Sequence, residues 1–439
     1  MSDGNDPGRQ GWDGRSSAPA SHIDDRAAIL QDLRDPLDRR TQPADRIHPT
    51  VCLEQRRWET PGRLGCGGQN PRVDGPRGEF LRPLGGCGQR HWLSLDGAIR
   101  CSGVRFGSMR MLFIGGTQFV GRSMVEAALA AGHEVTLLHR GRTGSQLFPE
   151  ATPLLADRDG DLSVLTGRSF DATFDVCAYV PRQVRALARA LEGRGGHHVF
   201  ISSVSAYDEP SAPGADESTP LVELEDKDVE EVTDQTYGGL KVECERAAAL
   251  AYRDALSVVR PTYVVGPWDH SGRFTWWVDR IARGGDVLCP GPSHAAMQVI
   301  DARDLATWTI SLAEHQVSGS FHAASPAPPF SMRDLLDTTA AAVAPPGTSL
   351  VWADADFLTA NGVDGSSMPL WAEGADENVM ALDTSAAQST GLSPRTLSET
   401  AVDTWAWMRT QDSPLRPEVG LGPGREAELL AKWRESSAG

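Results

Sequence analysis

The stretch MRMLFIGGTQFVGRSMVEAALAAGHEVTLLHRGRTG, residues 109–144, decides the fold. It opens with an apolar run at 111–114 that predicts a buried strand. Three glycines follow within seven positions, and then come an amphipathic run and a second apolar run at 135–138. Strand, glycine turn, helix and strand in this order are typical of a dinucleotide-binding unit, because the glycines let the backbone approach a pyrophosphate at the positive end of the helix.

Strand-like and helix-like patterns continue to alternate beyond this unit. Apolar runs that predict strands occur at 153–156, 170–180, 197–207 and 256–267, and helical patterns occur at 185–191 and 237–253. This alternation predicts an α/β fold of the Rossmann type, a doubly wound parallel sheet with right-handed crossovers. Beyond Pro267 the elements become shorter, which predicts a smaller C-terminal lobe that binds the substrate.

We expect four segments: residues 1–108, a Rossmann domain at 109–266, a substrate lobe at 267–411 that is interleaved with the Rossmann sheet, and a tail with a helix at 412–439. The first segment is crowded with Gly, Pro, Arg, Asp and Ser and lacks sustained periodicity. Such a composition predicts a disordered extension, because it buries too little apolar surface to offset chain entropy. Two alternatives stay open: a wrongly assigned start, with translation from Met109 or Met111, and a small folded module.

Charge and cysteine usage exclude several classes of protein. Residues 1–108 hold 16 arginines and 14 acidic side chains, a net charge of +2, whereas the whole chain carries −17 and the remainder therefore −19. A surface that acidic argues against general nucleic-acid binding. No apolar run reaches the roughly 18 residues that span a bilayer, and no secretory pattern begins the chain, so we expect a cytoplasmic protein. The seven cysteines form no Cys-x-x-Cys pair, which predicts neither a metal site nor a disulfide framework.

A second informative pattern, Tyr237-Gly-Gly-Leu-Lys241, lies at the start of the helix predicted at 237–253. Its spacing puts both side chains on one helical face. An ammonium group beside a phenol lowers the phenol pKa from about 10, so that a tyrosine can act as a general acid or base near neutral pH. A solvated surface pair is the alternative, but the chain has only three lysines, which argues against a chance pairing.

The strand predicted at 197–207 runs into three serines, Ser202, Ser203 and Ser205. It ends at the edge of the sheet where open α/β folds bind ligands, although serines also close strands as ordinary turn formers. Together with the glycine turn and the Tyr-Lys pair, this pattern resembles the extended short-chain dehydrogenase/reductases, the NAD(P)-dependent epimerase/dehydratase family. The resemblance runs from Met109 to about Trp407 and includes Arg260-Pro261 and the turn at 301–306.

The glycine turn itself resembles an atypical subgroup of that family. The usual Gly-x-x-Gly-x-x-Gly pattern would have its middle glycine at position 118, where this chain has Gln118, in GGTQFVG. The subgroup includes chloroplast stem-loop-binding proteins and actinobacterial reductases. It implies either of two functions. One is an NAD(P)-dependent oxidoreductase or epimerase that acts at a hydroxyl or ketone centre, of a nucleotide sugar or similar polar metabolite. The alternative is a non-catalytic dinucleotide-fold protein that binds RNA or a regulatory partner.

The resemblance implies roles for the residues singled out above. Tyr237 transfers the proton, Lys241 holds the nicotinamide ribose and Ser203 orients the substrate, with Ser202 and Ser205 as rivals. The implied cofactor contacts are Gly115, Thr117, Gln118, Phe119, Val120, Gly121, Arg140, Arg142, Asp157, Cys177, Ala178, Tyr237 and Lys241. Arginines after the second strand suit a 2′-phosphate, which favours NADP over NAD; exposed loop arginines are the alternative interpretation.

Substrate contacts are expected on the segment SGRFTWWVDR, residues 271–280. Arg273, Trp277 and Arg280 lie where related proteins bind the distal half of a nucleotide sugar, because arginines and a stacked tryptophan suit a diphosphate and a base. Tryptophans at this spacing also occur as core residues. We expect the protein to bind a small molecule and to bind neither a nucleic acid nor a membrane. Members of the family it resembles usually form homodimers, which implies a homodimer here.

Overall fold

The computed structural model describes residues 107–208, 210, 212–325, 330–371, 378–411 and 419–437. Apart from its last two residues, the extension predicted at 1–108 lies outside this set, as does the first part of the predicted tail.

Seven parallel strands form the central sheet, in the order β11-β6-β5-β4-β1-β2-β3. Their bounds are β1 Arg110–Ile114, β2 Glu134–His139, β3 Thr152–Leu155, β4 Ala172–Asp175, β5 His197–Ile201, β6 Leu256–Pro261 and β11 Gly319–Ala323. Strand β1 pairs with β2 on one side and with β4 on the other, so the strand order reverses there. This arrangement confirms the predicted Rossmann sheet, and it puts a ligand crevice at the carboxyl ends of β1 and β4.

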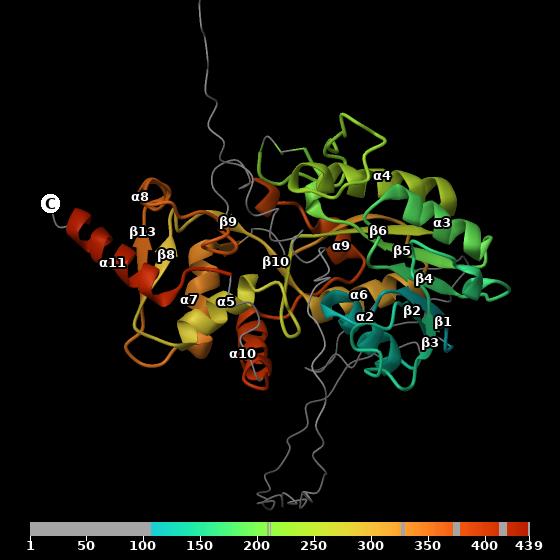
Figure 1. The fold of residues 1–439 in the computed structure, drawn as a ribbon, viewed down its shortest axis with the longest axis horizontal. Helices are drawn as coiled ribbons and strands as arrows, with labels where there is room; N and C mark the ends of the chain where they lie inside the picture. The colour runs from blue at the N-terminus through green and yellow to red at the C-terminus, as the bar shows by residue number, and fades with distance from the viewer. Residues whose placement is uncertain are drawn as a thin grey trace, which may run out of the picture. The chain divides into compact units, whose positions relative to one another are not determined.

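Helices cover both faces of the sheet (Figure 1). Helices α2 (Phe119–Ala130) and α6 (Ala302–Glu314) pack on one face, and α3 (Pro181–Leu191) and α4 (Asp234–Tyr252) pack on the other. The period of two in β1 explains this division, because successive side chains point to opposite faces. Phe113 stacks on Phe174 in the core beneath α2, with ring centroids 4.5 Å apart, whereas Leu112 joins the core beneath α3.

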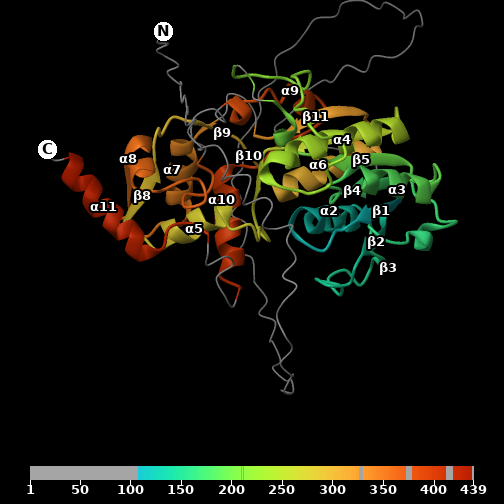
Figure 2. The same ribbon diagram turned by 45° about the horizontal axis from the view of Figure 1, so that its top comes forward.

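The second lobe is built mainly from the last third of the chain. Helices α5 (Arg273–Ala282), α7 (Met332–Val343) and α10 (Leu397–Met408) lie side by side (Figure 2). Strand β8 (Asp286–Pro290) pairs with β13 (Ser349–Ala353), and α11 (Pro423–Ser437) packs against β8. The short elements are η1 Ser163–Leu165, η2 Val204–Ala206, β7 Tyr263–Val265, β9 Ala296–Met297, β10 Val299–Asp301, β12 Phe330–Ser331, α8 Ala355–Ala360 and α9 Ser385–Ser389. The chain returns to the Rossmann sheet through α6 and β11, so the two lobes share the segment after residue 267.

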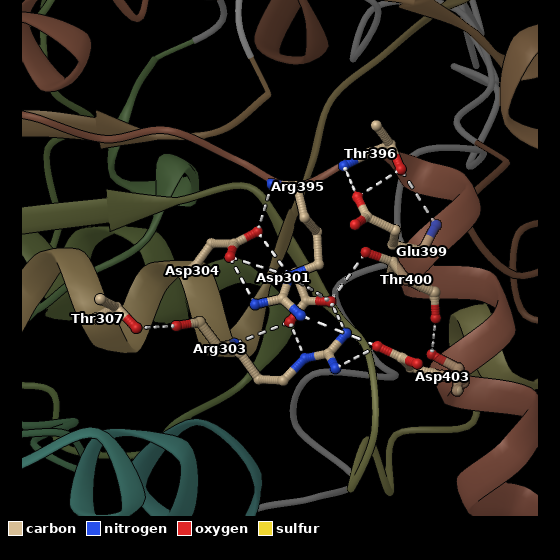
Figure 3. Close-up of polar contacts among 10 residues, drawn as sticks. Asp301, Arg303, Asp304, Thr307, Arg395, Thr396, Glu399, Thr400 and Asp403 are labelled. Atoms are coloured by element: carbon tan, nitrogen blue, oxygen red, sulfur yellow. Dashed lines mark hydrogen bonds and ion pairs between the residues drawn. The ribbon is translucent and has the colours of Figure 1, made fainter. Parts of the chain in front are cut away.

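A cluster of acids and arginines joins α6 to the segment that enters α10 (Figure 3). Asp301 caps α6 by accepting a hydrogen bond from the Arg303 amide, and its two oxygens also accept from the Arg303 guanidinium at 2.9 and 2.7 Å. Arg395 donates to both oxygens of Asp304, at 2.8 to 3.1 Å, and Arg303 pairs with Asp403 at 2.6 Å. We call these five residues the Asp301 cluster. Their mutual pairing fixes the Asp-Ala-Arg-Asp turn noted in the sequence.

Candidate active site

The glycine turn after β1 is built for close approach. Gly115 and Gly116 have φ of +97° and +100°, a conformation that only glycine adopts easily. A Cβ on Gly121 would lie 2.9 Å from both the Cα and the amide nitrogen of Gly116, so the third glycine lets α2 start directly against the turn. The N-cap, Gln118, makes no side-chain hydrogen bond to the helix, which leaves the first-turn amides to an anionic ligand. These features fit a dinucleotide pyrophosphate.

Gln118 does not disturb this turn. Its backbone is extended, with φ −134° and ψ 145°, and its side chain is exposed. The backbone conformation at this position therefore does not require glycine. Phe119 and Val120 point into the core beneath α2, so only their backbone amides face the turn.

The structure brings most of the other predicted cofactor residues to the same sheet edge. Arg140, Arg142 and Asp157 are exposed in the loops that follow β2 and β3. The thiol of Cys177 lies 3.4 Å from the carbonyl oxygen of Ile114, beside Gly115. Two further contacts complete the set: the hydroxyls of Thr117 and Thr143 are 3.3 Å apart, and the Ala178 carbonyl accepts a hydrogen bond from Lys241 at 3.0 Å.

An ion pair that the sequence interpretation missed lies beneath this edge. Arg158 donates to both oxygens of Asp175, at 2.6 and 2.9 Å, and both side chains are almost fully buried. Burial opposes ionisation of Asp175, but the Arg158 guanidinium outweighs it and holds the pKa of that carboxyl below its usual value. The pair ties the loop after β3, which carries Asp157, to the end of β4. The charged run DRDGD, residues 157–161, was the signal for this pair in the sequence, but it does not indicate that Asp175 is the partner of Arg158.

Helix α4 brings Tyr237 and Lys241 up to the serine turn. Thr233 caps it, in a reciprocal pair with Thr236. A Cβ on Gly238 would lie 2.0 Å from the carbonyl oxygen of Ser205, so this glycine is required for the helix to lie against the turn. Lys241 is buried, and its Nζ donates to the carbonyl oxygens of Ala178 at 3.0 Å and Ile201 at 2.6 Å.

The electrostatics of Tyr237 differ from the prediction made from the Tyr-Lys spacing. Burial raises the pKa of Tyr237, and the opposing influences are a hydrogen bond with Ser203 and the charge of Arg273. The expectation that Lys241 lowers this pKa is therefore not met here, because its ammonium group is directed at two carbonyl oxygens. Among the three serines, Ser203 is the one whose hydroxyl opposes the rise in the pKa of Tyr237, and this hydroxyl also accepts from the Ser205 amide at 3.1 Å.

A second buried network supports α4 from below. Arg260, in β6, donates to both carboxylate oxygens of Glu245 at 2.6 and 3.0 Å, and to the Tyr207 hydroxyl at 2.5 Å. Tyr207 also bonds Nε2 of His322 at 2.6 Å. Glu245 lies one helical turn beyond Lys241, so the network fixes the helix that carries the Tyr-Lys pair. This explains the Arg-Pro motif structurally.

A cavity of about 200 Å³ opens beside Tyr237. Its walls include the predicted residues Ser203, Lys241 and Arg273, and also Ser202 and Thr262. The structure thus gathers a phenol, an ammonium, a guanidinium and several hydroxyls around one small space. Such a set can bind a polyhydroxylated substrate and move a proton at one of its oxygens.

Two of the three predicted substrate residues do not reach this cavity. Trp277 is fully buried, and its indole Nε1 donates to the carbonyl oxygen of Pro369 at 2.5 Å. Arg280 is buried against Glu426 of α11, with Nε 2.5 Å from the carboxylate, and also donates to two backbone carbonyls. The polar atoms of both side chains are bonded within the lobe, and neither side chain lines the cavity that we describe as the candidate substrate site. Of the three predicted substrate residues, only Arg273 lines the cavity.

Comparisons with known proteins concern the family and the fold. Residues 167–323 match the model of the NAD dependent epimerase/dehydratase family. A curated relative, the chloroplast stem-loop binding protein of 41 kDa b from Arabidopsis thaliana, is 23% identical over 216 residues, which cover 45% of this chain and 53% of the relative. The chain thus spans about half the length of this relative.

Solved structures share the fold. A putative epimerase from Burkholderia cenocepacia has a TM-score of 0.53 and 20% identity, over 69% of this chain and 99% of its own. UDP-glucuronic acid 4-epimerase from Bacillus cereus, in complex with NAD, has a TM-score of 0.52 and 13% identity, over 70% and 99%. The Bordetella bronchiseptica enzyme WbmG, in complex with NAD and UDP, gives 0.52 and 18%, over 70% and 96%. At such identities the likeness concerns the fold alone.

The described residues contain neither a membrane-spanning helix nor a cluster of metal-binding side chains. No helix in the described ranges is long and apolar enough to cross a membrane. Within those same ranges, no group of three or more His, Cys, Asp or Glu side chains could hold a metal ion.

Proposed function

We propose that this protein is an NAD(P)-dependent oxidoreductase or epimerase that acts at a hydroxyl or ketone centre of a nucleotide sugar or similar polar metabolite. One observation carries the proposal: Tyr237 and Ser203 line one polar cavity together with Lys241, at the same sheet edge as the glycine turn. A general acid or base beside a dinucleotide site is what hydroxyl–ketone interconversion requires.

The roles follow from the positions. The glycine turn and the first amides of α2 would hold the pyrophosphate, and Lys241, fixed by two carbonyls, would hold the nicotinamide ribose. The nicotinamide, when bound, takes up or returns a hydride at the substrate carbon. Tyr237 moves the proton of the substrate oxygen, and Ser203 orients that oxygen. Burial disfavours the Tyr237 phenolate. The Ser203 hydrogen bond and the Arg273 charge act in the opposite direction and would stabilise the phenolate during proton transfer.

The cofactor is proposed to be NADP rather than NAD. Arg140 and Arg142 follow the strand whose end usually contacts the adenosine ribose, and guanidinium groups bind a phosphate in bidentate fashion. Titration of nicotinamide fluorescence with NADPH and NADH tests this. We expect tighter NADPH binding, and roughly a tenfold loss of NADPH affinity alone in the double variant Arg140→Ala/Arg142→Ala. Arg189→Ala, an exposed arginine of α3, is the matched control. Equal affinity for the two cofactors would refute the preference.

The catalytic assignment is tested with Tyr237→Phe. Turnover is followed by nicotinamide absorbance on a panel of UDP-sugars and short hydroxy and keto acids. The variant should lose turnover by at least two orders of magnitude while its NADPH affinity stays nearly unchanged, because the phenol moves the proton and the glycine turn and Lys241 supply most of the cofactor contacts. Undiminished turnover in the variant would rule out the role of Tyr237.

A second candidate function comes from the curated relative, whose name describes stem-loop binding. It predicts a dinucleotide fold that has become an RNA-binding surface. The formal charge of −17 opposes it, since RNA binding needs cationic contacts with phosphates. Fluorescence anisotropy with a labelled stem-loop RNA discriminates the two: salt-sensitive binding of RNA together with no binding of either nicotinamide cofactor would favour this candidate.

A further inference from the structure

Three buried polar atoms that lack a hydrogen-bond partner among the described residues belong to the walls of one cavity. They are Oγ of Ser202, Oγ1 of Thr262 and Nε of Arg273, and all three residues line the space beside Tyr237. The side chains of Ser202 and Thr262 come from residues that are only 4% and 7% exposed. Buried polar groups are almost always bonded, so their gathering in one place indicates a polar ligand with several oxygens.

Arg273 gives this cavity a positive wall. It is the first residue of α5, directly after Gly272, where the amides of the first turn carry the positive end of the helix dipole. Its guanidinium lies 5.6 Å from the ring centroid of Tyr263, another residue of the cavity wall. The nearby carboxyl of Asp269 is fully buried and bonds the Ser271 amide through Oδ1, while its Oδ2 has no partner among the described residues. Arg273 and Asp269 form no ion pair within 4 Å, although the Arg273 charge opposes the rise that burial causes in the pKa of Asp269, and Arg273 lines the cavity.

The size of the cavity limits the ligand. At about 200 Å³ it is smaller than the 300–1,000 Å³ typical of sites for drug-sized ligands. Trp277, which bonds the Pro369 carbonyl, and Arg280, which pairs with Glu426, are not among the residues that line it. One sugar ring or a short chain matches the size of this space, whereas a base and its diphosphate would have to extend beyond it.

We propose that this cavity binds a small carboxylate-bearing hydroxy or keto compound, with its carboxylate on the Arg273 guanidinium and the first turn of α5. Hydroxyls of the ligand bond Ser202 and Thr262, and the reacting oxygen faces Tyr237. This inference rests on the proposed function and narrows its substrate to the anionic, non-nucleotide class. A carboxylate is preferred to a phosphate because the planar fork of arginine binds it side-on and the smaller group suits the space.

The test is a binding measurement on the full chain saturated with NADP⁺, by isothermal titration calorimetry. The probes are matched pairs of acid and neutral compound: glucuronate with glucose, gluconate with sorbitol, and malate with butanetriol; UDP-glucose serves as the nucleotide sugar. We expect at least one acid to bind roughly ten- to a hundredfold more tightly than its neutral partner, because a charge-assisted bidentate contact is added.

The Arg273→Met variant should lose that preference while its affinity for NADP⁺ is unchanged, and Arg273→Lys should retain part of it. Arg283→Met, an exposed arginine at the other end of α5, is the matched control. If Arg273→Met fails to fold, Arg273→Lys should still show a reduced acid preference, and Thr262→Val should bind the acid and its neutral partner more weakly. Failure of every acid to bind would overturn the inference, as would an undiminished acid preference in Arg273→Met or, where that variant does not fold, in Arg273→Lys. Tighter binding of UDP-glucose than of any acid would also overturn it. Loss of NADP⁺ binding in the wild type would instead count against the proposed function.

Discussion

The Asp301 cluster and the cavity beside Tyr237 use similar side chains to opposite ends. In the cluster, every carboxylate meets an arginine: Asp301 meets Arg303, Asp304 meets Arg395, and the distances lie between 2.7 and 3.1 Å (Figure 3). In the cavity, Ser202, Thr262 and Arg273 each keep a buried atom without a partner among the described residues. Satisfied polar atoms stabilise the fold, whereas unsatisfied ones lower its stability and gain their bonds from a ligand.

The largest effect is expected from Asp301→Ala. The carboxylate is buried, caps α6 and accepts hydrogen bonds from Arg303 and Thr400, so its removal leaves several donors without a partner. Breaking a buried pair typically costs about 3–5 kcal/mol of unfolding free energy. Urea denaturation measures the loss. NADPH affinity of the remaining folded protein should be unchanged, because the cluster does not touch the cofactor edge.

Asp403→Asn is the control for this prediction. Its carboxylate pairs with the same Arg303 at 2.6 Å, but the side chain is 46% exposed. Surface pairs contribute about 0–1 kcal/mol, so this variant should lose far less stability. Equal losses in the two variants would show that burial does not govern the cluster.

Much of the fold was predictable because it depends on local patterns. The glycine turn, the alternation of strands and helices and the four-residue Tyr-Lys spacing each lie within a few dozen positions. The order of strands on both sides of β1 then follows from the handedness of the crossovers. Lys241 and Tyr237 come together with Ser203 because parallel strands end at one edge.

The parts that were not predicted depend on partners far along the chain. Arg280 resembled a substrate residue, yet its partner Glu426 lies 146 positions away, and the carbonyl that holds Trp277 lies 92 positions away. The sequence pattern around residues 271–280 does not predict those contacts. The pKa of Tyr237 was likewise set by burial and by Arg273, which the four-residue spacing cannot report.

An intermediate loss of stability is expected from protonation of His198. This residue extends the comparison between the Asp301 cluster and the cavity beside Tyr237, because its unbonded ring nitrogens are buried but do not line that cavity. Both ring nitrogens are buried without a partner among the described residues, and the ring stacks on Tyr252 at 3.8 Å. Burial lowers the pKa of His198 to about 4, although the charge of Asp175 opposes this. Between pH 6.5 and 4 the unfolded chain therefore binds a proton that the folded chain does not. Stability should be complete above pH 6.5 and fall by roughly 3 kcal/mol as the pH approaches 4.

The measurement is unfolding free energy as a function of pH in the wild type and in His198→Phe, which keeps an aromatic ring on Tyr252. The variant should show a shallower loss of stability across this window. Tyr252→Phe, which leaves the imidazole in place, should keep the wild-type slope. An identical slope in wild type and His198→Phe would mean that the ring finds a bonding partner after all.

The smallest effect gives the most direct comparison of the two regions, because one substitution can be made in both. Thr262 and Thr400 are buried to a similar degree, at 7% and 2% exposure, but within the described ranges only the Thr400 hydroxyl has a partner, Asp301 at 2.9 Å. Thr400→Val should cost about 1.5–3 kcal/mol, the value of a hydrogen bond to a charged group. Thr262→Val should change the unfolding free energy by less than about 1 kcal/mol, since it removes a hydroxyl without an internal bond. The order should reverse for ligand binding: Thr262→Val should weaken the acid that Arg273 binds, and Thr400→Val should not. A Thr262→Val variant that is as unstable as Thr400→Val would mean that the Thr262 hydroxyl is bonded inside the fold, and the cavity would then lose its claim to an oxygen-rich ligand.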